Sequence, residues 1–472
     1  MHRAPPGASG RRERSAGDQC GPVDATGLRY AGEGGLHIVF AVEGSSPREV
    51  VRVRKRLPSR RDEDGPAARA IDAWAWPGLL QEVQTRGAMA HAFGGAVMAP
   101  LVGASFVAET RRIATPTDAA VAALRACGER RPERWRQQTD QCLAHDLFDD
   151  TAELRLDYFE PDEPRGVPRG APRCVLEVKP KWGLRPCTSA ALAGPHADVR
   201  ATTSRYRMHQ ALKVEEGRAA APSAYEPADL LSGDGVRVLR ALAALSDSPQ
   251  NNLGVHGNTP PLDVLAAALC ASGVLRAIRD VQALDVIGFP GAAALVGALR
   301  ASLTSDAACA DVGDATLPPA ASVDLRALQI AVSDVGKTLE AAASSGAGAD
   351  GALAALRCAG EHGGLSWAAA RAALQGFQAS MCARDCAIIL QVWGPLEGGA
   401  GAGAAWAATR GVAECCACPE RALVRRAGEV WRYRVYVSDL DIKPLTRVDE
   451  WLRKDARITE AYVRSTRPDI AN

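Results

Sequence analysis

The sequence of 472 residues lacks an excess of either charge, because 56 Lys and Arg side chains balance 55 Asp and Glu to within one unit. A net charge of +1 creates no field that would draw a polyanion to the whole surface, so any anion site must come from local clusters. The chain also lacks a long hydrophobic run. The longest apolar stretch, near Val286–Leu299, is too short for a bilayer and contains Pro290. No basic stripe alternates with aromatic residues. We therefore expect neither a membrane nor a nucleic-acid partner.

Regular cysteine spacing is also absent, although the chain has 13 cysteines. No hydrophobic signal peptide precedes them, and residues 1–27, rich in Arg, Gly, Pro and Ser, are typical of a disordered tail. We expect reduced thiols in a cytoplasmic or nuclear protein. Cys415 and Cys418 have the C-x₂-C spacing of a zinc site, but no second pair matches them. We predict no zinc site.

Two common nucleotide-binding signatures are missing as well. The chain has no G-x-x-x-x-G-K-[ST] loop and no pair of H-R-D and D-F-G motifs. A P-loop enzyme and a true protein kinase are both disfavoured. No coiled-coil pattern is present either, and we expect a monomer.

Patterns of hydrophobic residues predict strands near both ends of the chain and helices between them. The pattern predicts a strand, a Gly-rich turn and a second strand over Gly27–Val42. Apolar and charged residues alternate over Glu49–Arg56, as they do in a strand. Ala67–His91 looks helical, and the apolar stretch Ala96–Ala108 looks β-like. Further strands are predicted over Arg173–Lys181, Asp385–Trp393 and Val430–Val437, and helices over Ser204–Lys213 and up to about Arg464. This segregation favours an α+β body over a doubly wound sheet.

Two short segments could contact phosphate groups. Glycines at 32, 34 and 35 would let the backbone approach phosphates closely, although a hairpin without a ligand explains them equally well. Strand alternation places Glu177, Lys179 and Lys181 on one face. A solvated edge strand is the alternative there, but fixed lysines are what a phosphate site needs.

Three further segments carry candidate chemistry. Arg205, His209 and Lys213 lie four residues apart and share a helical face, which binds an anion or simply faces solvent. Asp385 precedes an apolar strand, where a catalytic acid or a turn cap could stand. In Asp439–Pro444, two carboxylates two residues apart suit Mg²⁺, although an acidic turn would look the same.

In their order along the chain, these motifs resemble the inositol-pentakisphosphate 2-kinase family. The matching segments are GEGG at 32–35, VVRVRK at 50–55, HDLF at 145–148, EVKPKWG at 177–183, SRYRMHQALK at 204–213, SPQNN at 248–252, DCAIIL at 385–390 and DLDIKPL at 439–445. The resemblance extends over most of residues 28–463.

The resemblance implies a two-lobed α+β fold, like that of protein kinases and inositol polyphosphate kinases, with Ala/Gly-rich insertions. The implied N-lobe with its Gly-rich turn covers 28–140 after the tail at 1–27. A C-lobe with the inositide-binding segments covers 141–472, with flexible insertions near 341–364 and 396–412.

The resemblance also implies roles for residues at the nucleotide end of a site. ATP would lie under Gly32, Gly34 and Gly35, with Arg52 on its phosphates and the His145 segment near the hinge. Asp439 would bind Mg²⁺. Asp385 matches the family's catalytic aspartate, and Lys179 would contact the transferring phosphate.

The substrate-binding residues implied by the same matches are Arg136, Lys181, His209, Lys213, Asn251, Asn252, Lys443 and Arg447. Arg134 is close behind Arg136 as the N-lobe arginine that clamps the substrate. Two positions depart from the family pattern. His37 stands where Asn is usual, and Gly254 stands where a basic residue often follows the paired asparagines. No counterpart of the zinc site of plant members exists near Leu303–Ala315.

The expected activity is ATP-dependent phosphorylation of the 2-hydroxyl of inositol 1,3,4,5,6-pentakisphosphate to give the hexakisphosphate, phytate. A base such as Asp385 would orient the poorly nucleophilic hydroxyl. One alternative is a binding protein of the same fold with weak or no transfer activity, which His37 and Gly254 motivate. Another is a kinase of lower inositol phosphates, which the same residues would also serve.

Overall fold

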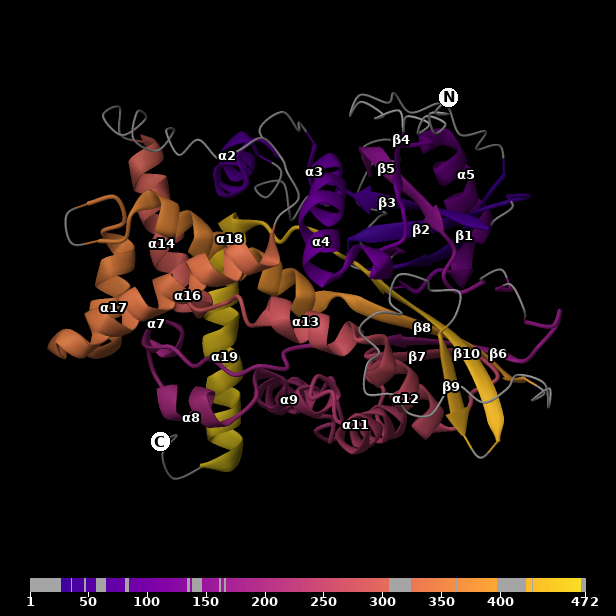
Figure 1. Ribbon diagram of the computed structural model, residues 1–472. Helices are drawn as coiled ribbons and strands as arrows, with labels where there is room; N and C mark the ends of the chain where they lie inside the picture. The colour runs from indigo at the N-terminus through magenta and orange to yellow at the C-terminus, as the bar shows by residue number, and fades with distance from the viewer. Residues whose placement is uncertain are drawn as a thin grey trace, which may run out of the picture.

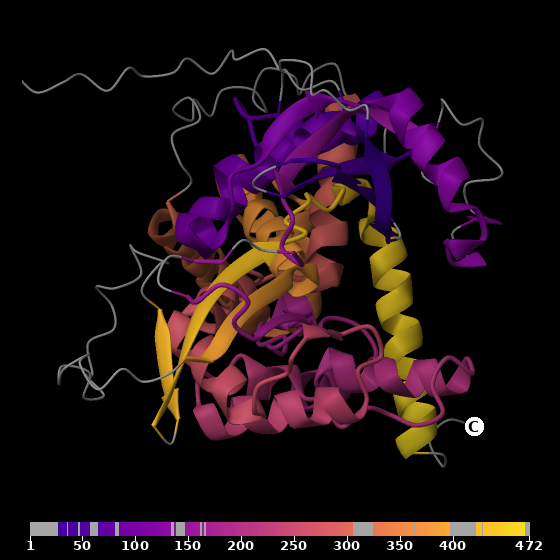
Figure 2. The ribbon, with the colours of Figure 1, turned by 90° about the vertical axis from the view of Figure 1, so that its right-hand side faces the viewer.

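The computed structural model describes residues 27–34, 36–45, 48–56, 65–80, 85–133, 136–137, 147–160, 163–164, 167–304, 324–361, 364–396, 422–426 and 428–467. It contains two five-stranded antiparallel sheets together with many helices, which confirms the α+β composition. Figures 1 and 2 show the first sheet on one side of the molecule and the second sheet, with most of the helices, on the other.

The first sheet has the strand order β1-β2-β3-β5-β4. Its strands are β1 (Leu28–Glu33), β2 (His37–Val42), β3 (Glu49–Lys55), β4 (Arg111–Ala114) and β5 (Phe148–Leu156). Alternation in β2 directs Ile38 and Phe40 into a core shared with Val51 and Val53 of β3. The strands expected over 27–42 and 49–56 are therefore confirmed. Because β5 belongs to this sheet, the sheet extends past residue 140, where the first lobe was expected to end.

The second sheet has the order β7-β6-β8-β10-β9. Its strands are β6 (Arg173–Val178), β7 (Leu253–Gly257), β8 (Ala387–Leu396), β9 (Leu423–Arg426) and β10 (Glu429–Ser438). The central strand β8 is buried on both faces from Ala387 to Trp393, as its largely apolar sequence predicts, and the one polar side chain within it, Gln391, donates to the Tyr158 carbonyl at 2.8 Å. Three of the strands were expected. The other two were not predicted: β7, which lies in an otherwise helical region, and the short edge strand β9.

Helices cover the second sheet and extend the body beyond it (Figure 1). They are α2 (Pro66–Ala75), α3 (Arg86–Phe93), α4 (Ala99–Val102), α5 (Thr117–Cys127), α7 (Ser189–Leu192), α8 (Ala197–Thr202), α9 (Arg205–Glu215), α10 (Pro227–Leu230), α11 (Gly235–Asp247), α12 (Leu262–Ser272), α13 (Val274–Gln282), α14 (Gly288–Thr304), α16 (Leu325–Ala342), α17 (Gly348–Arg357), α18 (Trp367–Asp385) and α19 (Val448–Thr466). Short π-helices span Gly94–Met98 and Ala343–Ala347, and short 3₁₀ turns span Ala104–Phe106, Gly128–Arg130 and Leu445–Arg447.

The predicted helix at 204–213 is confirmed in detail. Ser204 caps α9, and its hydroxyl accepts a hydrogen bond from the Arg207 N–H at 3.3 Å. The apolar side of α9 packs against α19 through Met208, Leu212 and Ile458. The polar side of α9 takes no part in this apolar contact.

Three expectations about local structure are wrong. Ala96–Ala108 is helical rather than β-like, since a short apolar run fits a buried helix as well as a strand. Ala67–His91 is two helices, because Pro77 and Gly78 interrupt it, with Gly78 at φ 74°. Residues 341–364 are not a surface insertion. There α17 packs into the core, and Leu356 is fully buried. The tail up to residue 26 and residues 397–412 lie outside the described residues.

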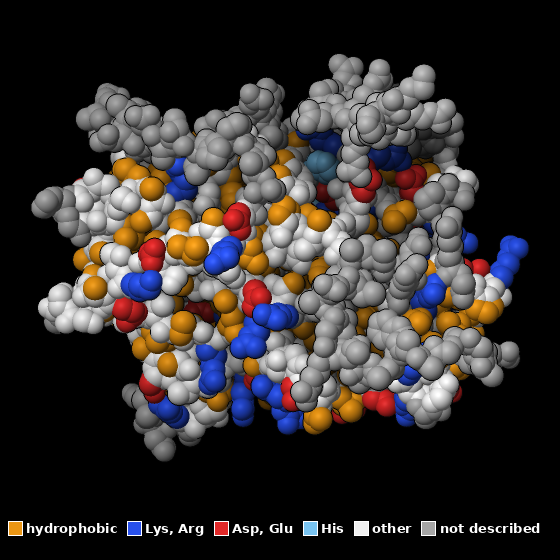
Figure 3. Space-filling model, viewed as in Figure 1, with side chains coloured by type: hydrophobic (Ala, Val, Ile, Leu, Met, Phe, Trp, Pro, Cys, Tyr) orange, Lys and Arg blue, Asp and Glu red, His pale blue; other side chains and the backbone are white. Residues whose placement is uncertain are grey.

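Charged side chains of both signs are interspersed over the helical part of the face in Figure 3. Within the described residues, no helix is both long and apolar enough to cross a membrane.

Candidate functional site

A cavity of about 1120 Å³ lies between the two sheets and takes its walls from both of them. Thirteen predicted site residues line it: Gly32, Gly34, Arg52, Lys179, Lys181, His209, Lys213, Asn251, Asn252, Asp385, Asp439, Lys443 and Arg447. Arg136 is not among the lining residues, and Gly35 and His145 lie outside the described residues. Segments more than 400 positions apart therefore meet around one space.

The glycine turn between β1 and β2 forms one edge of the cavity. The Gly34 N–H donates to the His37 carbonyl at 2.9 Å and closes the hairpin. A Cβ atom at Gly32 or Gly34 would contact nothing within 4 Å, so packing alone does not require glycine at either position. Glu33 anchors the turn: its buried carboxylate pairs with Arg131 at 2.9 and 3.1 Å and lies 3.6 Å from Lys55 Nζ.

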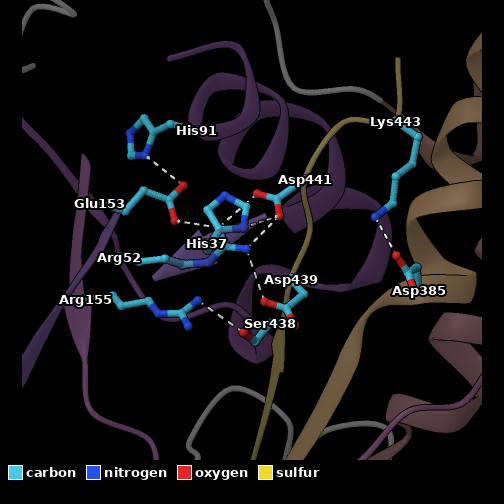
Figure 4. A network of polar contacts seen from close by, with 10 residues as sticks. All are labelled: His37, Arg52, His91, Glu153, Arg155, Asp385, Ser438, Asp439, Asp441 and Lys443. Atoms are coloured by element: carbon cyan, nitrogen blue, oxygen red, sulfur yellow. Dashed lines mark hydrogen bonds and ion pairs between the residues drawn. The ribbon is translucent and has the colours of Figure 1, made fainter. Parts of the chain in front are cut away.

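Arg52 on β3 points into a group of three carboxylates (Figure 4). Two of its nitrogens donate to Asp441 at 2.6 and 2.9 Å, and it also contacts Glu153 at 3.1 Å and Asp439 at 3.2 Å. Both Asp439 and Asp441 were candidates for a metal site. The structure separates them, because the Asp441 side chain is 7% exposed and the Asp439 side chain is 37% exposed. Asp439 thus remains accessible from the cavity.

His37, the residue that departs from the family pattern, lies beside this group, with Nδ1 3.8 Å from Asp441. Burial lowers the pKa of His37 to about 3, and the neighbouring Arg52 lowers it further than Asp441 can offset. The imidazole is therefore neutral at physiological pH and adds no charge to the site.

A second cluster surrounds Asp385, the last residue of α18. Its carboxylate lies 2.7 Å from Lys443 Nζ and 3.9 Å from Lys181 Nζ (Figure 4 shows the first pair). Enclosure in the cavity works against ionisation of Asp385, but the two ammonium groups outweigh it and lower the pKa. Asp385 is an ionised carboxylate able to accept a hydrogen bond from a hydroxyl group.

The α9 face also turns to the cavity, as its spacing predicts. Arg205, His209 and Lys213 all line it, and Lys213 donates to the Gln250 side chain at 3.0 Å. Burial lowers the pKa of His209 to about 3, helped by nearby cations. Its buried Nε2 has no hydrogen-bond partner among the described residues. An imidazole nitrogen without a partner, on a helix face that also carries Arg205 and Lys213, is available for a hydrogen bond to an anionic group.

The paired asparagines differ in their surroundings. Asn252 is buried, and its amide donates to the Tyr206 hydroxyl at 3.0 Å, while its backbone carbonyl accepts from the Lys179 N–H at 2.9 Å. Asn251 is exposed and has φ 65°. Lys181 and Asp439 also have positive φ values, of 59° and 60°. Backbone strain is thus concentrated on residues that line the cavity.

The sequence reading missed several lining residues. Lys454 lies on α19, seven residues after Arg447, and its pKa is lowered by burial and by neighbouring arginines. The spacing of seven residues after Arg447 was an available signal. Trp182, Phe289 and Trp451 form an aromatic wall, with the Trp182 and Phe289 rings 5.3 Å apart. Long-range packing alone brings these rings together.

The residues fit a nucleotide, a divalent cation and a polyanionic substrate. Lysines and arginines from the segment after β6, from α9 and from α19 line the same cavity, and charge-assisted hydrogen bonds from such groups bind phosphates. Among the described residues no cluster of three His, Cys, Asp or Glu side chains forms a protein-only metal site. Mg²⁺ commonly binds through one or two carboxylates together with phosphate oxygens and water. Asp439 fits that arrangement. Cys415 and Cys418 lie outside the described residues.

Comparison with known proteins gives a consistent result. A family model described as inositol-pentakisphosphate 2-kinase matches residues 30–457. The inositol-pentakisphosphate 2-kinase of Oryza sativa subsp. indica is 31% identical over 245 residues, which cover 49% of this chain and 52% of the relative. The Arabidopsis thaliana enzyme of the same name is 26% identical over 318 residues, covering 57% and 69%. That of Danio rerio is 30% identical over 161 residues, covering 34% and 31%. The aligned part spans about half the length of the rice relative.

Proposed function

The chain belongs to the inositol-pentakisphosphate 2-kinase family, and we propose that it is an active kinase that converts inositol 1,3,4,5,6-pentakisphosphate and ATP into inositol hexakisphosphate and ADP. One observation carries the proposal. An ionised carboxylate, Asp385, lies between Lys443 and Lys181 in the same cavity as the glycine turn and Asp439. A protein that only bound the polyanion would need neither a base nor a metal ligand there.

The cavity offers each reactant a distinct region. Val39 and Val50 of the first sheet and Ile389 of the second provide apolar contacts for a nucleobase. The open glycine turn leaves room for phosphates beside it. In this arrangement the two sheets act as the two lobes of a protein-kinase-like fold, with the nucleotide between them.

In the reaction, the 2-hydroxyl oxygen forms a bond to the γ-phosphorus as the bond to the ADP oxygen breaks. Asp385 accepts the hydrogen bond, and then the proton, of that hydroxyl. Lys179 and Lys181 hold the transferring and substrate phosphates in line, and most of the catalysis in such transfers comes from positioning and charge. Mg²⁺, when held at Asp439, supplies positive charge on the phosphate oxygens of ATP.

The substrate carries five phosphate groups, which the cations of the cavity neutralise. Lys213 and His209 of α9 approach from one side, and Lys443, Arg447 and Lys454 from another. The uncharged Nε2 of His209 gains its missing hydrogen-bond partner from a phosphate oxygen. This local clustering explains how a chain with almost no net charge binds a strongly charged molecule.

The test is incubation of the purified chain with MgATP and inositol 1,3,4,5,6-pentakisphosphate, followed by anion-exchange separation of the products. We expect hexakisphosphate from the wild type, and a loss of about 100-fold or more in kcat for Asp385→Asn. Tight binding of the pentakisphosphate without any product would refute the proposal and favour the binding-protein alternative. Faster turnover of a less phosphorylated inositol would redirect it to another substrate.

A further inference from the structure

Gln282, the last residue of α13, lies outside the cavity and is 1% exposed. Its side-chain amide makes three hydrogen bonds to the backbone of other segments. Nε2 donates to the carbonyls of Lys181 at 2.8 Å and Ala383 at 3.3 Å, and Oε1 accepts from the Gly183 N–H at 3.0 Å. The Ser380 hydroxyl in turn donates to the Gln282 carbonyl at 2.8 Å. One buried side chain therefore ties the loop after β6 to the end of α18.

These two segments carry groups that face each other in the cavity. The backbone carbonyl of Lys181 accepts one of the Gln282 hydrogen bonds. The carbonyl of Ala383, two residues before Asp385, accepts another. The charged atoms of Lys181 and Asp385 lie 3.9 Å apart. Lys181 holds φ at 59°, a conformation that is unfavourable for a non-glycine residue and persists only when neighbouring contacts enforce it. The Gln282 bonds on either side of Trp182 are such contacts.

The packing of Gly183 and Trp182 supports the same geometry. A Cβ atom on Gly183 would lie 2.4 Å from Leu231 Cδ1, so the loop is pressed against the core at this point. The guanidinium of Arg384 lies 3.9 Å from the centre of the Trp182 ring. Arg384, which immediately precedes Asp385, is itself held by Asp285 at 2.7 Å. The loop and the helix end are thus joined twice, by hydrogen bonds and by a stacked cation.

We infer that Gln282 is a positioning residue for phosphoryl transfer, which holds Lys181 and Asp385 at the spacing the reaction requires. The inference rests on the proposed kinase function, but it concerns a residue that does not reach the reactants. A buried amide whose two donors and one acceptor are all used on backbone groups fixes both segments more firmly than apolar packing would. Losing it moves the two reacting groups relative to each other, while the nucleotide region between the sheets is unaffected.

The test compares two variants. Gln282→Met keeps the volume of the side chain but cannot form the hydrogen bonds, and Gln282→Asn keeps the amide on a side chain that is one methylene group shorter. The control is Gln375→Met on α18. That glutamine donates to the Ala75 carbonyl at 2.8 Å, away from the cavity. Steady-state kinetics would give kcat and the KM for ATP, and hydrogen–deuterium exchange would follow the Gly183 amide. We expect kcat to fall about 10- to 100-fold in both Gln282 variants, since a displacement of about 1 Å can cost that much.

The KM for ATP should stay within about twofold of wild type, and the Gly183 amide should exchange at least about tenfold faster. The control should keep its kcat and its Gly183 protection. A kcat equal to wild type in folded Gln282→Met, or an unchanged Gly183 amide, would overturn the inference. An inactive wild type would instead refute the proposed function, and the exchange of Gly183 in the variants would still decide whether Gln282 fixes the loop.

Discussion

Replacing Asp441 with asparagine removes one partner of a buried ion pair between the first sheet and the segment after β10. The Asp441 side chain is 7% exposed and that of Arg52 is 5% exposed, and two hydrogen bonds of 2.6 and 2.9 Å join them. Breaking a buried pair can cost about 3–5 kcal/mol when the remaining charge is left uncompensated. Here Glu153 and Asp439 still face Arg52, so we expect a smaller loss of about 2–3 kcal/mol, typical of hydrogen bonds to charged groups.

Asp439 is the matched control, since it contacts the same guanidinium from a side chain that is 37% exposed. Asp439→Asn should cost about 1 kcal/mol or less in the free energy of unfolding, as partly exposed pairs do. It should nevertheless abolish Mg²⁺-dependent turnover. The two variants therefore separate a stabilising carboxylate from a metal-binding one within a single motif of six residues.

The dependence on pH adds a second test of the Asp441 pair. Burial opposes ionisation of Asp441, but Arg52 outweighs it and lowers the pKa well below the usual range. A carboxyl group with a lowered folded-state pKa stabilises the fold above its unfolded-state pKa of about 3.9 and loses that contribution as the pH falls through the folded-state value. The difference in stability between wild type and Asp441→Asn should be constant from pH 7 to pH 5 and should shrink below about pH 4.

The assay is urea unfolding followed by tryptophan fluorescence, for wild type and both variants at each pH. Equal losses of stability in Asp441→Asn and Asp439→Asn at pH 7 would refute the assigned roles. A difference between wild type and Asp441→Asn that grew on acidification would refute the direction of the pKa shift.

Two further predictions follow from the same cavity. Arg131→Met removes the guanidinium that donates two hydrogen bonds to Glu33 beneath the glycine turn and leaves Lys55 as a more distant cation. It should raise the KM for ATP severalfold, while inositide affinity, measured by calorimetry, stays the same. Equal changes in both quantities would contradict a local role for the turn. Binding of the pentakisphosphate should raise the low pKa of His209, so calorimetry near pH 6 in buffers of different ionisation enthalpy should detect proton uptake that His209→Gln lacks. Equal proton uptake by the variant would assign the proton to another group.

The local parts of the site could be predicted from the sequence. The spacing of four residues in α9 places Arg205, His209 and Lys213 on one face because every α-helix repeats about every 3.6 residues. The strand before Lys179 and the acid before β8 follow from equally local patterns. The secondary structure of short apolar segments, such as 96–108, was predicted less accurately, because such a run fits a buried helix or a strand.

Only the tertiary structure decided what each of these groups does. Asp439 and Asp441 look equivalent in the sequence, yet Arg52, almost 390 positions earlier, covers one and leaves the other accessible. Gln282 belongs to no motif, since its role depends on backbone atoms about 100 residues away on both sides. The sequence by itself determined which faces and turns carry charge, because those depend on neighbours within a few residues. Which charges are paired, buried or left open depends on contacts between distant segments, and these exist only once the chain has folded.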